Sequence, residues 1–449
     1  MPYPESEYWN PATETLDPER LRALQLAKFR RVLSWVYERS PMYRRKYEAA
    51  GLRPEDVRTW DDVARVPLVT KDDYRCQGKD PFPYGDTLCV PLEEVTEFHQ
   101  TSGTTGTPVY QPDTWADWEW FSELWATILW AQGYRPTDRI FFPFGYHVFI
   151  AFWTAHYGAE RMGCEVVPGG VLGTRERLLK MRELKVNAFM ATPTYVLGMA
   201  ETAQKELGAD PREWGIRRIT CAGEPGALVP STKRRMQDAW GCPVYDHVGA
   251  TEVGAWGFEC RHQPFGQHII ESMFLVELLE LDSDRPVTEP GVPGRIVITA
   301  FDRRAQPCVR FDTKDVSMWA KDPCGCGRTW RILEGGVHGR VDHITKVKGV
   351  LFSPVTVEEV VRSFEELDGE FEIYVEKRGD LDHITLKVEL PDGLAGPDRE
   401  HLLKELASRL RWKTQLNFEI QPQPYGSLPR YQVKARRFHD LRKTGGSQR

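Results

Sequence analysis

The feature that most constrains the fold is an alternation of helix-like and strand-like segments between residues 115 and 192. A helix rich in aromatic side chains is predicted over 115–132, and a short apolar strand over 139–143 follows it. Two more helix–strand pairs come next, with helices predicted over 149–163 and 175–184 and strands over 165–168 and 187–192. Strands that are separated by helices pair in a parallel or mixed sheet whose faces the helices cover. We therefore predict an α/β fold.

The segments on either side of this alternation predict further units. Residues 18–47 carry apolar side chains at helical spacing, which indicates an amphipathic helical start. Beyond about residue 254, short apolar runs separated by Pro and Gly are typical of a β-rich region. The C-terminal part predicts a small α+β unit, with helices over 355–367 and 398–411 and strands over 371–375 and 383–388. A chain of 449 residues has room for two or more domains.

Composition narrows the classes of function. A net charge of −6 and 41% apolar residues give no electrostatic reason to expect a nucleic acid or an anionic membrane as partner. No window approaches the roughly 18 uninterrupted apolar residues of a membrane-spanning helix. The first 16 residues hold no apolar run and no basic leader, so a cytoplasmic protein is expected. Nine cysteines, most of them far apart, do not resemble a disulfide framework.

The stretch Thr101-Ser-Gly-Thr-Thr-Gly-Thr-Pro108 combines two glycines and five hydroxyl side chains without any charge. Bare backbone N–H groups can converge on phosphate oxygens, and hydroxyl groups add neutral donors. No lysine follows Gly106, as the common phosphate-binding loop requires, and the stretch contains no G-x-G-x-x-G. It is therefore either a phosphate-binding loop of another kind or a polar turn between a strand and the helix that starts near residue 115.

Four further motifs follow this stretch in a fixed order: Ala222-Gly-Glu-Pro225, Asp246-His-Val-Gly-Ala-Thr-Glu252, Arg310-Phe-Asp-Thr-Lys-Asp315 and Gly339-Arg-Val-Asp-His343. Together with residues 101–108 they resemble the adenylate-forming superfamily, which comprises the acyl-CoA synthetases and their relatives. Within it, three more segments are similar to the phenylacetate-CoA ligase type: Ser40-Pro-Met-Tyr-Arg-Arg-Lys-Tyr47, Ala155-His-Tyr-Gly-Ala-Glu-Arg161 and Gly426-Ser-Leu-Pro-Arg430 with Lys434-Ala435. The resemblance runs from about residue 20 to the end of the chain.

This resemblance implies an enzyme in which a carboxylate attacks the α-phosphate of ATP, giving an acyl-adenylate and pyrophosphate, before CoA forms the thioester. The implied cofactors are ATP, CoA and Mg²⁺. The expected substrate is a small aromatic carboxylic acid. The sequence does not decide between an arylacetic acid and an acid with an indole-sized ring. Because two anions must be brought together, charge neutralisation and alignment are expected to dominate catalysis.

The resemblance also implies roles for single residues. Glu252 matches the Mg²⁺ ligand of the family, Thr251 a contact of the α-phosphate, and Asp315 the acceptor of both ribose hydroxyls. Lys434 matches the catalytic lysine and is favoured over Arg436 for that role. The other implied ATP contacts are Thr101, Ser102, Gly103, Thr104, Thr105, Gly106, Ala222, Gly223, Glu224, Pro225, Asp246, His247, Val248 and Arg340.

Residues 339–343 resemble the hinge of the family, with Asp342 as the pivot of a large rotation. We therefore expect an adenylation domain over 1–341, with mixed sheets and a β-rich subdomain, and a small mobile α+β domain over 342–449. A homodimer is left open.

Two positions depart from the family pattern, because Val248 replaces a tyrosine that stacks on adenine and Asp312 replaces an arginine. Two alternatives therefore stay open. One is an adenylating enzyme that transfers the acyl group to a carrier protein or an amine. The other is a nucleotide-binding regulatory relative without turnover.

Residues 142–153 contain six aromatic rings and one histidine, and the corresponding segment builds part of the acyl pocket in the family. The segment either lines a slot for a planar ring or packs as a core helix. The expected substrate contacts are Phe144, Tyr146, Phe149 and Ala222.

Cys324-Gly-Cys326, together with Cys260, His262 and His268, offers enough soft ligands for a tetrahedral zinc site. The alternative is a set of reduced thiols in a loop, since the two halves lie about sixty residues apart. Some relatives of the phenylacetate-CoA ligase type hold a structural zinc on similar elements. That resemblance implies Cys260, His268, Cys324 and Cys326 as the ligands.

Overall fold

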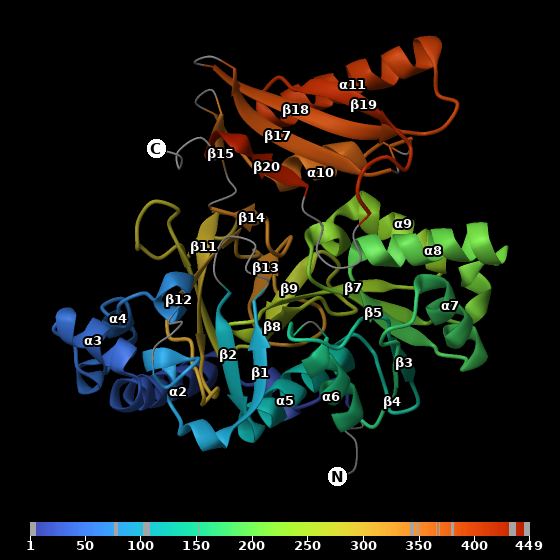
Figure 1. Ribbon diagram of the computed structural model, residues 1–449. Coiled ribbons are helices and arrows are strands. Elements are labelled where there is room, and N and C mark those ends of the chain that lie inside the picture. The colour runs from blue at the N-terminus through green and yellow to red at the C-terminus, as the bar shows by residue number, and fades with distance from the viewer. Residues whose placement is uncertain are drawn as a thin grey trace.

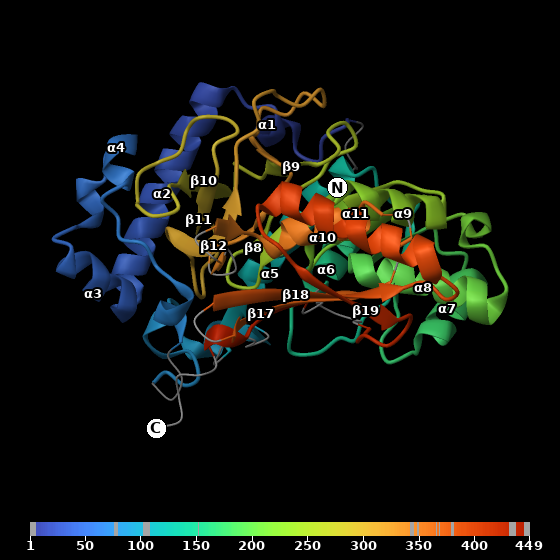
Figure 2. The same ribbon diagram turned by 90° about the horizontal axis from the view of Figure 1, so that it is seen from above.

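The computed structural model describes residues 6–75, 80–101, 108–150, 152–341, 345–347, 350–364, 366–367, 369–378, 381–430 and 437–443. A large N-terminal unit carries a smaller C-terminal unit above it (Figure 1). The view from above shows the C-terminal helix α11 and its sheet lying across the larger unit near α8 and α9 (Figure 2). The predicted α/β class is confirmed.

An eight-stranded sheet forms the centre of the large unit, in the order β13-β9-β8-β7-β6-β5-β3-β4. Five neighbouring strands are parallel: β3 (Arg139–Phe142), β4 (Glu165–Pro168), β5 (Ala188–Ala191), β6 (Arg218–Cys221) and β7 (Val244–Ala250). The sheet continues with antiparallel strands: β8 (Gly254–Phe258), β9 (Gly266–Ile269) and β13 (Ile332–Glu334). The strands predicted over 139–143, 165–168 and 187–192 are confirmed.

The parallel strands are buried on both faces. Ile140 and Phe142 of β3 belong to the hydrophobic cluster that includes α5 and α6, whereas Phe141 belongs to the cluster of the opposite face. That second cluster includes α7 (Thr174–Glu183), α8 (Pro193–Leu207) and α9 (Pro230–Trp240). A sheet covered on both sides needs continuous apolar runs in its strands. Burial of both faces of the sheet is therefore the reason why residues 140–142 form an uninterrupted apolar run.

The helix α5 (Trp115–Ala131) is buried along most of its length. Its start is fixed because Asp117 accepts a hydrogen bond from the backbone of Thr114 at 2.9 Å and donates its own N–H to Oγ1 of Thr114 at 3.2 Å. The helix α6 (Trp153–Arg161) packs against α5 at Gly158. A Cβ at Gly158 would lie 2.3 Å from the Cβ of Trp125, so only glycine permits this approach.

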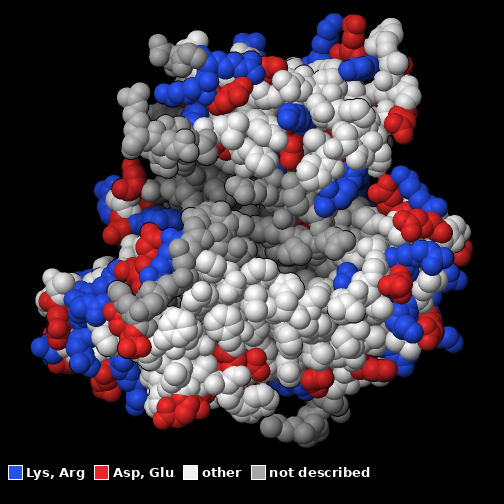
Figure 3. Space-filling view, in the orientation of Figure 1, with Lys and Arg blue, Asp and Glu red and all other residues white. Residues whose placement is uncertain are grey.

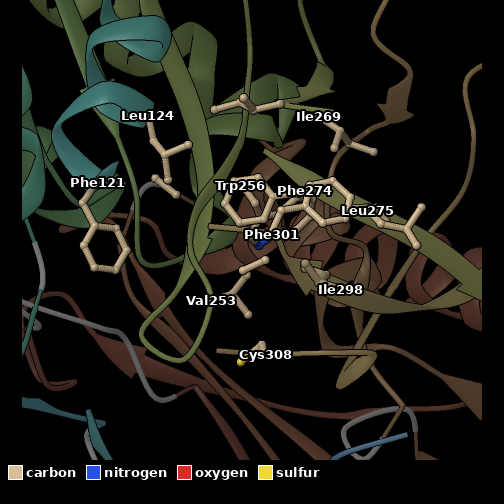
Figure 4. Packing of buried hydrophobic residues seen from close by; sticks show 14 of the residues in the cluster. Phe121, Leu124, Val253, Trp256, Ile269, Phe274, Leu275, Ile298, Phe301 and Cys308 are labelled. Atoms are coloured by element: carbon tan, nitrogen blue, oxygen red, sulfur yellow. The ribbon is translucent and has the colours of Figure 1, made fainter. Parts of the chain in front are cut away.

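A second, antiparallel sheet lies beside α5. Its strands, in spatial order, are β10 (Phe274–Leu279), β11 (Gly294–Ala300), β12 (Phe311–Ser317) and β14 (Gly339–Arg340). Phe121 and Leu124 of α5, Trp256 of β8 and Phe274 of β10 belong to one buried cluster with Ile298 of β11 (Figure 4). The predicted β-rich region therefore shares one core with the α/β part.

The N-terminal helices differ in one respect from the predicted helical start. The helix α2 (Pro18–Arg39) ends before Ser40, and α3 (Pro41–Ala49) begins anew. The side chain of Ser40 accepts a hydrogen bond from the backbone of Tyr43 at 3.4 Å, and a proline ring at position 41 cannot continue α2. The remaining short elements are α1 (Pro11–Glu14), α4 (Trp60–Val63), β1 (Val95–Gln100), β2 (Tyr110–Thr114), η1 (Pro54–Asp56), η2 (Lys71–Tyr74), η3 (Gly85–Thr87), η4 (Leu92–Glu94), η5 (Pro211–Trp214), η6 (Pro225–Leu228) and η7 (Leu441–Lys443).

The C-terminal unit has its own hydrophobic cluster. Its sheet has the order β19-β18-β17-β20, made of β17 (Phe371–Arg378), β18 (Leu381–Leu390), β19 (Glu419–Pro424) and β20 (Phe438–Asp440). The other elements are α10 (Pro354–Arg362), α11 (Gly396–Thr414), β15 (Thr345–Val347) and β16 (Val350–Phe352). The helices and strands predicted here are confirmed, and the domain boundary near residue 341 stays a prediction.

Charged side chains of both signs are spread over the face of the molecule shown in Figure 3. On the face shown in Figure 3, basic and acidic side chains are interspersed at the sides of the large unit, and the middle of that unit is mostly uncharged. Among the described residues, no helix combines the length and the apolar character that crossing a membrane requires.

We predict that Gly158→Ala lowers the free energy of unfolding by about 1–3 kcal/mol, because the added methyl group would force α6 away from α5. Gly198→Ala in α8 is the matched control, since a Cβ at Gly198 meets nothing within 4 Å. That control should be neutral or stabilise the protein slightly. Urea unfolding followed by circular dichroism measures both variants. Equal unfolding midpoints for the two variants would contradict the tight packing at Gly158.

Candidate active site

Most of the predicted nucleotide-binding residues that the structure describes lie within β7 or after the carboxyl end of β6. The motif 222–225 follows β6 directly, and Gly223 in it adopts a φ of 91°, which glycine tolerates without strain. Asp246, His247 and Val248 lie within β7, and Thr251 and Glu252 follow its end. Parallel strands bring their carboxyl ends to one edge of the sheet, and ligands of open α/β sheets bind there. Seven predicted residues lie outside the described residues: Ser102, Gly103, Thr104, Thr105, Gly106, Asp342 and Lys434.

The predicted phosphate-binding loop is closed at its base. The backbone N–H of Thr101 donates to the carbonyl of Val109 at 3.0 Å, and the N–H of Val109 donates to Oγ1 of Thr101 at 2.9 Å. Thr101 is buried. These two hydrogen bonds hold the ends of the loop together between the antiparallel strands β1 and β2. The loop therefore connects β1 to β2 and is not the turn between a strand and the helix α5. The helix follows β2 instead.

Glu252, the predicted magnesium ligand, is buried and faces a cation. Nζ of Lys71 lies 3.0 Å from Oε1 of Glu252, and the Lys71 side chain is 35% exposed. Sequence reasoning missed Lys71, which lies in η2, about 180 residues before Glu252. The spacing of Thr70 and Asp73, which form a capping box, could have predicted the turn that presents Lys71. It could not have predicted which carboxylate the lysine meets.

A buried ion pair links the loop hairpin to the Thr251–Glu252 turn. Nε and Nη2 of Arg303 donate to Oδ1 of Asp113 at 2.9 and 2.7 Å, and both side chains are completely buried. Nη1 of the same arginine donates to the carbonyl of Glu252 at 2.6 Å and to that of Thr251 at 3.2 Å. Burial raises the pKa of the Asp113 carboxyl to about 7, and Arg303 opposes that rise. Arg303 thus fixes the two predicted phosphate-binding elements relative to each other.

Asp315, the predicted ribose acceptor, and Arg340, another predicted ATP contact, lie in the second sheet. Asp315 on β12 is paired with Arg340 on β14, and Nη1 of Arg340 lies 3.4 Å from Oδ1 of Asp315. The carboxylate of Asp312, the residue that departs from the family pattern, is buried and forms ion pairs with Arg295 and Lys314. Its negative charge is therefore offset locally.

Two residues of β7 point into the protein interior. The carboxylate of Asp246 accepts a hydrogen bond from the side chain of Gln267, and burial raises its pKa well above the ordinary value. The ring of His247 stacks on Trp125 of α5 with the centroids 4.2 Å apart. Burial lowers the pKa of His247 to about 3, so its ring is neutral. Among the described residues, neither ring nitrogen of His247 has a hydrogen-bond partner.

The predicted substrate residues are brought together in part. The rings of Phe144 and Tyr146 lie 4.4 Å apart, and the hydroxyl of Tyr146 lies 2.8 Å from Nδ1 of His156. Phe149 packs edge-on against His147 at 4.7 Å instead. Ala222 and Phe144 both pack against the main hydrophobic cluster. The segment 142–153 was expected either to line a slot or to pack as a core helix. Phe142 ends β3, residues 143–150 are irregular, and Trp153 begins α6, so the described residues of the segment do not form one core helix.

The four predicted zinc ligands form one buried group. The ligand atoms of Cys260, His268, Cys324 and Cys326 all lie within 4.8 Å of one another. Backbone N–H groups donate to the sulfurs of Cys260, Cys324 and Cys326 at 3.4–3.5 Å. Hydrogen bonds from Cys260 and from His268 lower the pKa of the Cys326 thiol. Three converging sulfurs and an imidazole form the donor set of a structural tetrahedral site.

Two family models match the chain. The model for the AMP-binding enzyme matches residues 63–300, and the model for the AMP-binding enzyme C-terminal domain matches residues 349–442. The phenylacetate-coenzyme A ligase of Escherichia coli (strain K12) is 32% identical over 439 residues, which cover 97% of this chain and 98% of that protein. The phenylacetate-coenzyme A ligase of Thermus thermophilus is 32% identical over 455 residues, which cover 97% of this chain and 100% of that protein.

Solved structures match over nearly the whole chain. A crystal structure of 2-hydroxyisobutyryl-CoA ligase in the postadenylation state, in complex with 2-HIB-AMP, has a TM-score of 0.92 at 29% identity and covers 99% of this chain and 94% of its own. The same enzyme in complex with 2-HIB-AMP and CoA in the thioesterification state has a TM-score of 0.74 at 30% identity and the same coverage. The chain therefore superposes better on the postadenylation state.

We predict that Asp113→Asn lowers the free energy of unfolding by about 3–5 kcal/mol at pH 8, where the carboxylate is ionised, because it leaves the buried charge of Arg303 without its counterion. Asp284→Asn is the matched control. It removes an exposed carboxylate that pairs with Arg295 and should cost at most about 1 kcal/mol. Denaturant unfolding at pH 8 measures both. A loss for Asp113→Asn no larger than that of the control would show that the pair does not hold the hairpin and the turn together.

Proposed function

This chain belongs to the phenylacetate-CoA ligase family of AMP-binding enzymes, and we infer that it is an ATP-dependent, AMP-forming ligase that joins an aromatic carboxylic acid to CoA. The observation that carries this inference is the link that Arg303 makes between the loop hairpin and the Thr251–Glu252 turn. It joins the hairpin that carries the uncharged, donor-rich sequence 101–108 to the turn that carries the buried carboxylate of Glu252, which faces Lys71. That combination suits a site that must bind a triphosphate and then release pyrophosphate.

The reaction has two steps. A carboxylate oxygen of the acid attacks the α-phosphorus of ATP, and the bond between that phosphorus and pyrophosphate breaks. The thiol sulfur of CoA then attacks the carbonyl carbon of the acyl-adenylate, the bond to AMP breaks and the thiol proton leaves to solvent. Both steps bring negatively charged or electron-rich groups together, so fixed positive charge and aligned donors supply most of the acceleration.

We assign the phosphate side of the site to three groups. The carboxylate of Glu252 fits Mg²⁺, because it is a hard ligand held at the open edge of the sheet. When bound, the metal would offset charge on the phosphates. Lys71, at 3.0 Å from Glu252, adds a second positive charge beside that position. Thr251 is assigned to the α-phosphate, and the loop 101–106 to the outer phosphates.

The nucleoside side is assigned to the second sheet and the end of β6. Asp315 and Arg340 would bind the ribose, with the carboxylate as acceptor for the hydroxyls. The backbone of residues 222–225 and the side chain of Val248 would border the adenine. Lys434 is assigned as the cation that bridges the carboxylate and the α-phosphate, and Asp342 as the hinge.

The aromatic acid is assigned to the wall formed by Phe144 and Tyr146, with Ala222 opposite. Ring contacts of this kind add about 0.5–1.5 kcal/mol beyond the burial of apolar area. The neutral imidazole of His247 finds no hydrogen-bond partner among the described residues. It stacks on Trp125, which belongs to the hydrophobic cluster that Phe144 packs against, and so brings two polar nitrogens to that cluster. Ring-hydroxylated acids and indoleacetic acid therefore belong in the substrate search. A cytoplasmic location stays a prediction, and whether the chain forms a homodimer stays open.

We predict that purified enzyme releases AMP only when ATP, CoA and an aromatic acid are all present. The panel comprises benzoic, phenylacetic, hydroxyphenylacetic, indoleacetic and medium-chain fatty acids. Lys434→Ala should abolish the first step, whereas Arg436→Ala is the matched control and should keep it. Pyrophosphate release without any dependence on CoA would indicate a carrier protein or an amine as acceptor. Silence across the panel would contradict the proposed function and favour the regulatory alternative.

We also propose that Cys260, His268, Cys324 and Cys326 hold a structural zinc ion. We predict about one zinc per chain by metal analysis, and that Cys326→Ser loses the metal and lowers the melting temperature. Cys242→Ala, at a buried cysteine outside the group, is the matched control and should keep the zinc. If the purified protein contains no metal and Cys326→Ser does not change its stability, the alternative of reduced thiols is favoured.

A further inference from the structure

Arg437 lies three positions after Lys434 and is held by two carboxylates of its own unit. Its Nε donates to Oε2 of Glu370 at 2.8 Å, and its Nη2 donates to Oε1 of Glu370 at 3.2 Å. Nη1 lies 3.5 Å from Oε1 of Glu358 on α10. The side chain is only 11% exposed. Burial lowers the pKa of Arg437, but Glu358 and Glu370 raise it more, so the guanidinium is charged.

The same guanidinium reaches across to the large unit. Nη2 of Arg437 donates to Oγ1 of Thr194 at 3.0 Å, and Thr194 lies in the first turn of α8. The backbone N–H of Thr194 donates to Oε1 of Glu224 at 2.6 Å. Burial raises the pKa of Glu224, and the charge of Arg437 opposes that rise. A continuous polar chain therefore runs from Glu370 through Arg437 and Thr194 to the motif 222–225.

A second polar contact between the units is more exposed. The hydroxyl of Tyr425 lies 3.4 Å from Oε1 of Glu201, and Nζ of Lys205 lies 5.3 Å from the centre of the Tyr425 ring. The side chains of Glu201 and Lys205 are 41% and 64% exposed. Interactions of exposed groups contribute little in water. The buried contact of Arg437 is therefore the stronger candidate for a restraint on the orientation of the C-terminal unit.

We propose that Arg437 is a positioning residue that latches the C-terminal unit onto the motif 222–225 in the adenylate-forming orientation. This proposal rests on the proposed function. The better match of the chain to a postadenylation structure than to a thioesterification structure agrees with it. Because the latch lies close in sequence to Lys434, closing it also limits where that lysine can reach. The contact to Thr194 must break before the unit can turn for the thioester step.

The test separates the two half-reactions. The first is acid-dependent exchange of pyrophosphate into ATP, and the second is CoA-dependent consumption of a supplied acyl-adenylate, both with the panel acid that releases the most AMP. Thr194→Val removes the hydroxyl that receives Arg437 and that also bonds the Glu224 carboxylate, and it leaves the bonds of Arg437 to Glu358 and Glu370 and the backbone bond of residue 194 to Glu224. We expect it to slow exchange about tenfold, and to leave the second step unchanged or faster. Arg437→Ala should slow exchange at least as much.

Tyr425→Phe is the matched control, because it removes the exposed contact between the same two units, and it should change either rate less than twofold. A loss of both half-reactions to the same extent in Thr194→Val would indicate a merely structural role and overturn the latch. Unchanged exchange in Thr194→Val would overturn it as well. A wild-type enzyme inactive in both assays would instead contradict the proposed function.

A distance measurement without substrate supports or overturns the latch independently of activity. Spin labels on the exposed positions Arg182 of α7 and Lys413 of α11 report the separation of the two units. Wild-type protein should show one dominant distance, and Thr194→Val should broaden it or shift it. Identical distance distributions in wild type and Thr194→Val would overturn the latch.

Discussion

The ion pair between Asp113 and Arg303 is the interaction on which the geometry of the site depends. Both side chains are completely removed from water, and an isolated charge in that environment would be very costly. The pair therefore tolerates only a narrow range of distances between β2 and the turn after β7. Asp117, in the first turn of α5, adds a bond to the backbone of Ala305 at 3.2 Å and so holds the segment that carries Arg303. The loop base, the turn and α5 are thus fixed as one body.

The central sheet explains why the predicted residues gather at all. Its parallel strands are covered on both faces, so their side chains serve packing and only the residues beyond the strand ends are available for ligands. The motif 222–225 and Glu252 occupy such positions. The second sheet contributes Asp315 because its strands pack on the same core. Along the central sheet, the motifs 222–225 and 246–252, about thirty residues apart in the sequence, therefore border one edge.

The fold could be predicted from the sequence wherever periodicity and burial agree, as in strands β3 to β5 and helices α10 and α11. Contiguous motifs could be predicted to lie beyond the ends of strands, and the resemblance to relatives indicated the four side chains of the buried cysteine–histidine group, whose role as zinc ligands stays a prediction. Contacts that depend on tertiary packing could not be predicted. Lys71 meets Glu252, and Thr194 meets Arg437, although nothing local distinguishes Lys71 or Thr194 from other surface residues. The break between α2 and α3 had a local signal, Ser40 before a proline, that apolar periodicity alone concealed.

The two polar links of the site differ in a way that suits their tasks. Breaking the pair of Asp113 and Arg303 would leave two buried charges without partners, so that link is permanent. Arg437 instead donates to a neutral hydroxyl of Thr194, while Glu358 and Glu370 of its own unit neutralise its charge. Releasing Thr194 costs one hydrogen bond and the attraction between Arg437 and the buried Glu224, whereas Arg437 itself keeps its two partner carboxylates. A contact of that strength can favour one orientation of the C-terminal unit during the first step and can still break when that unit rotates for the second step.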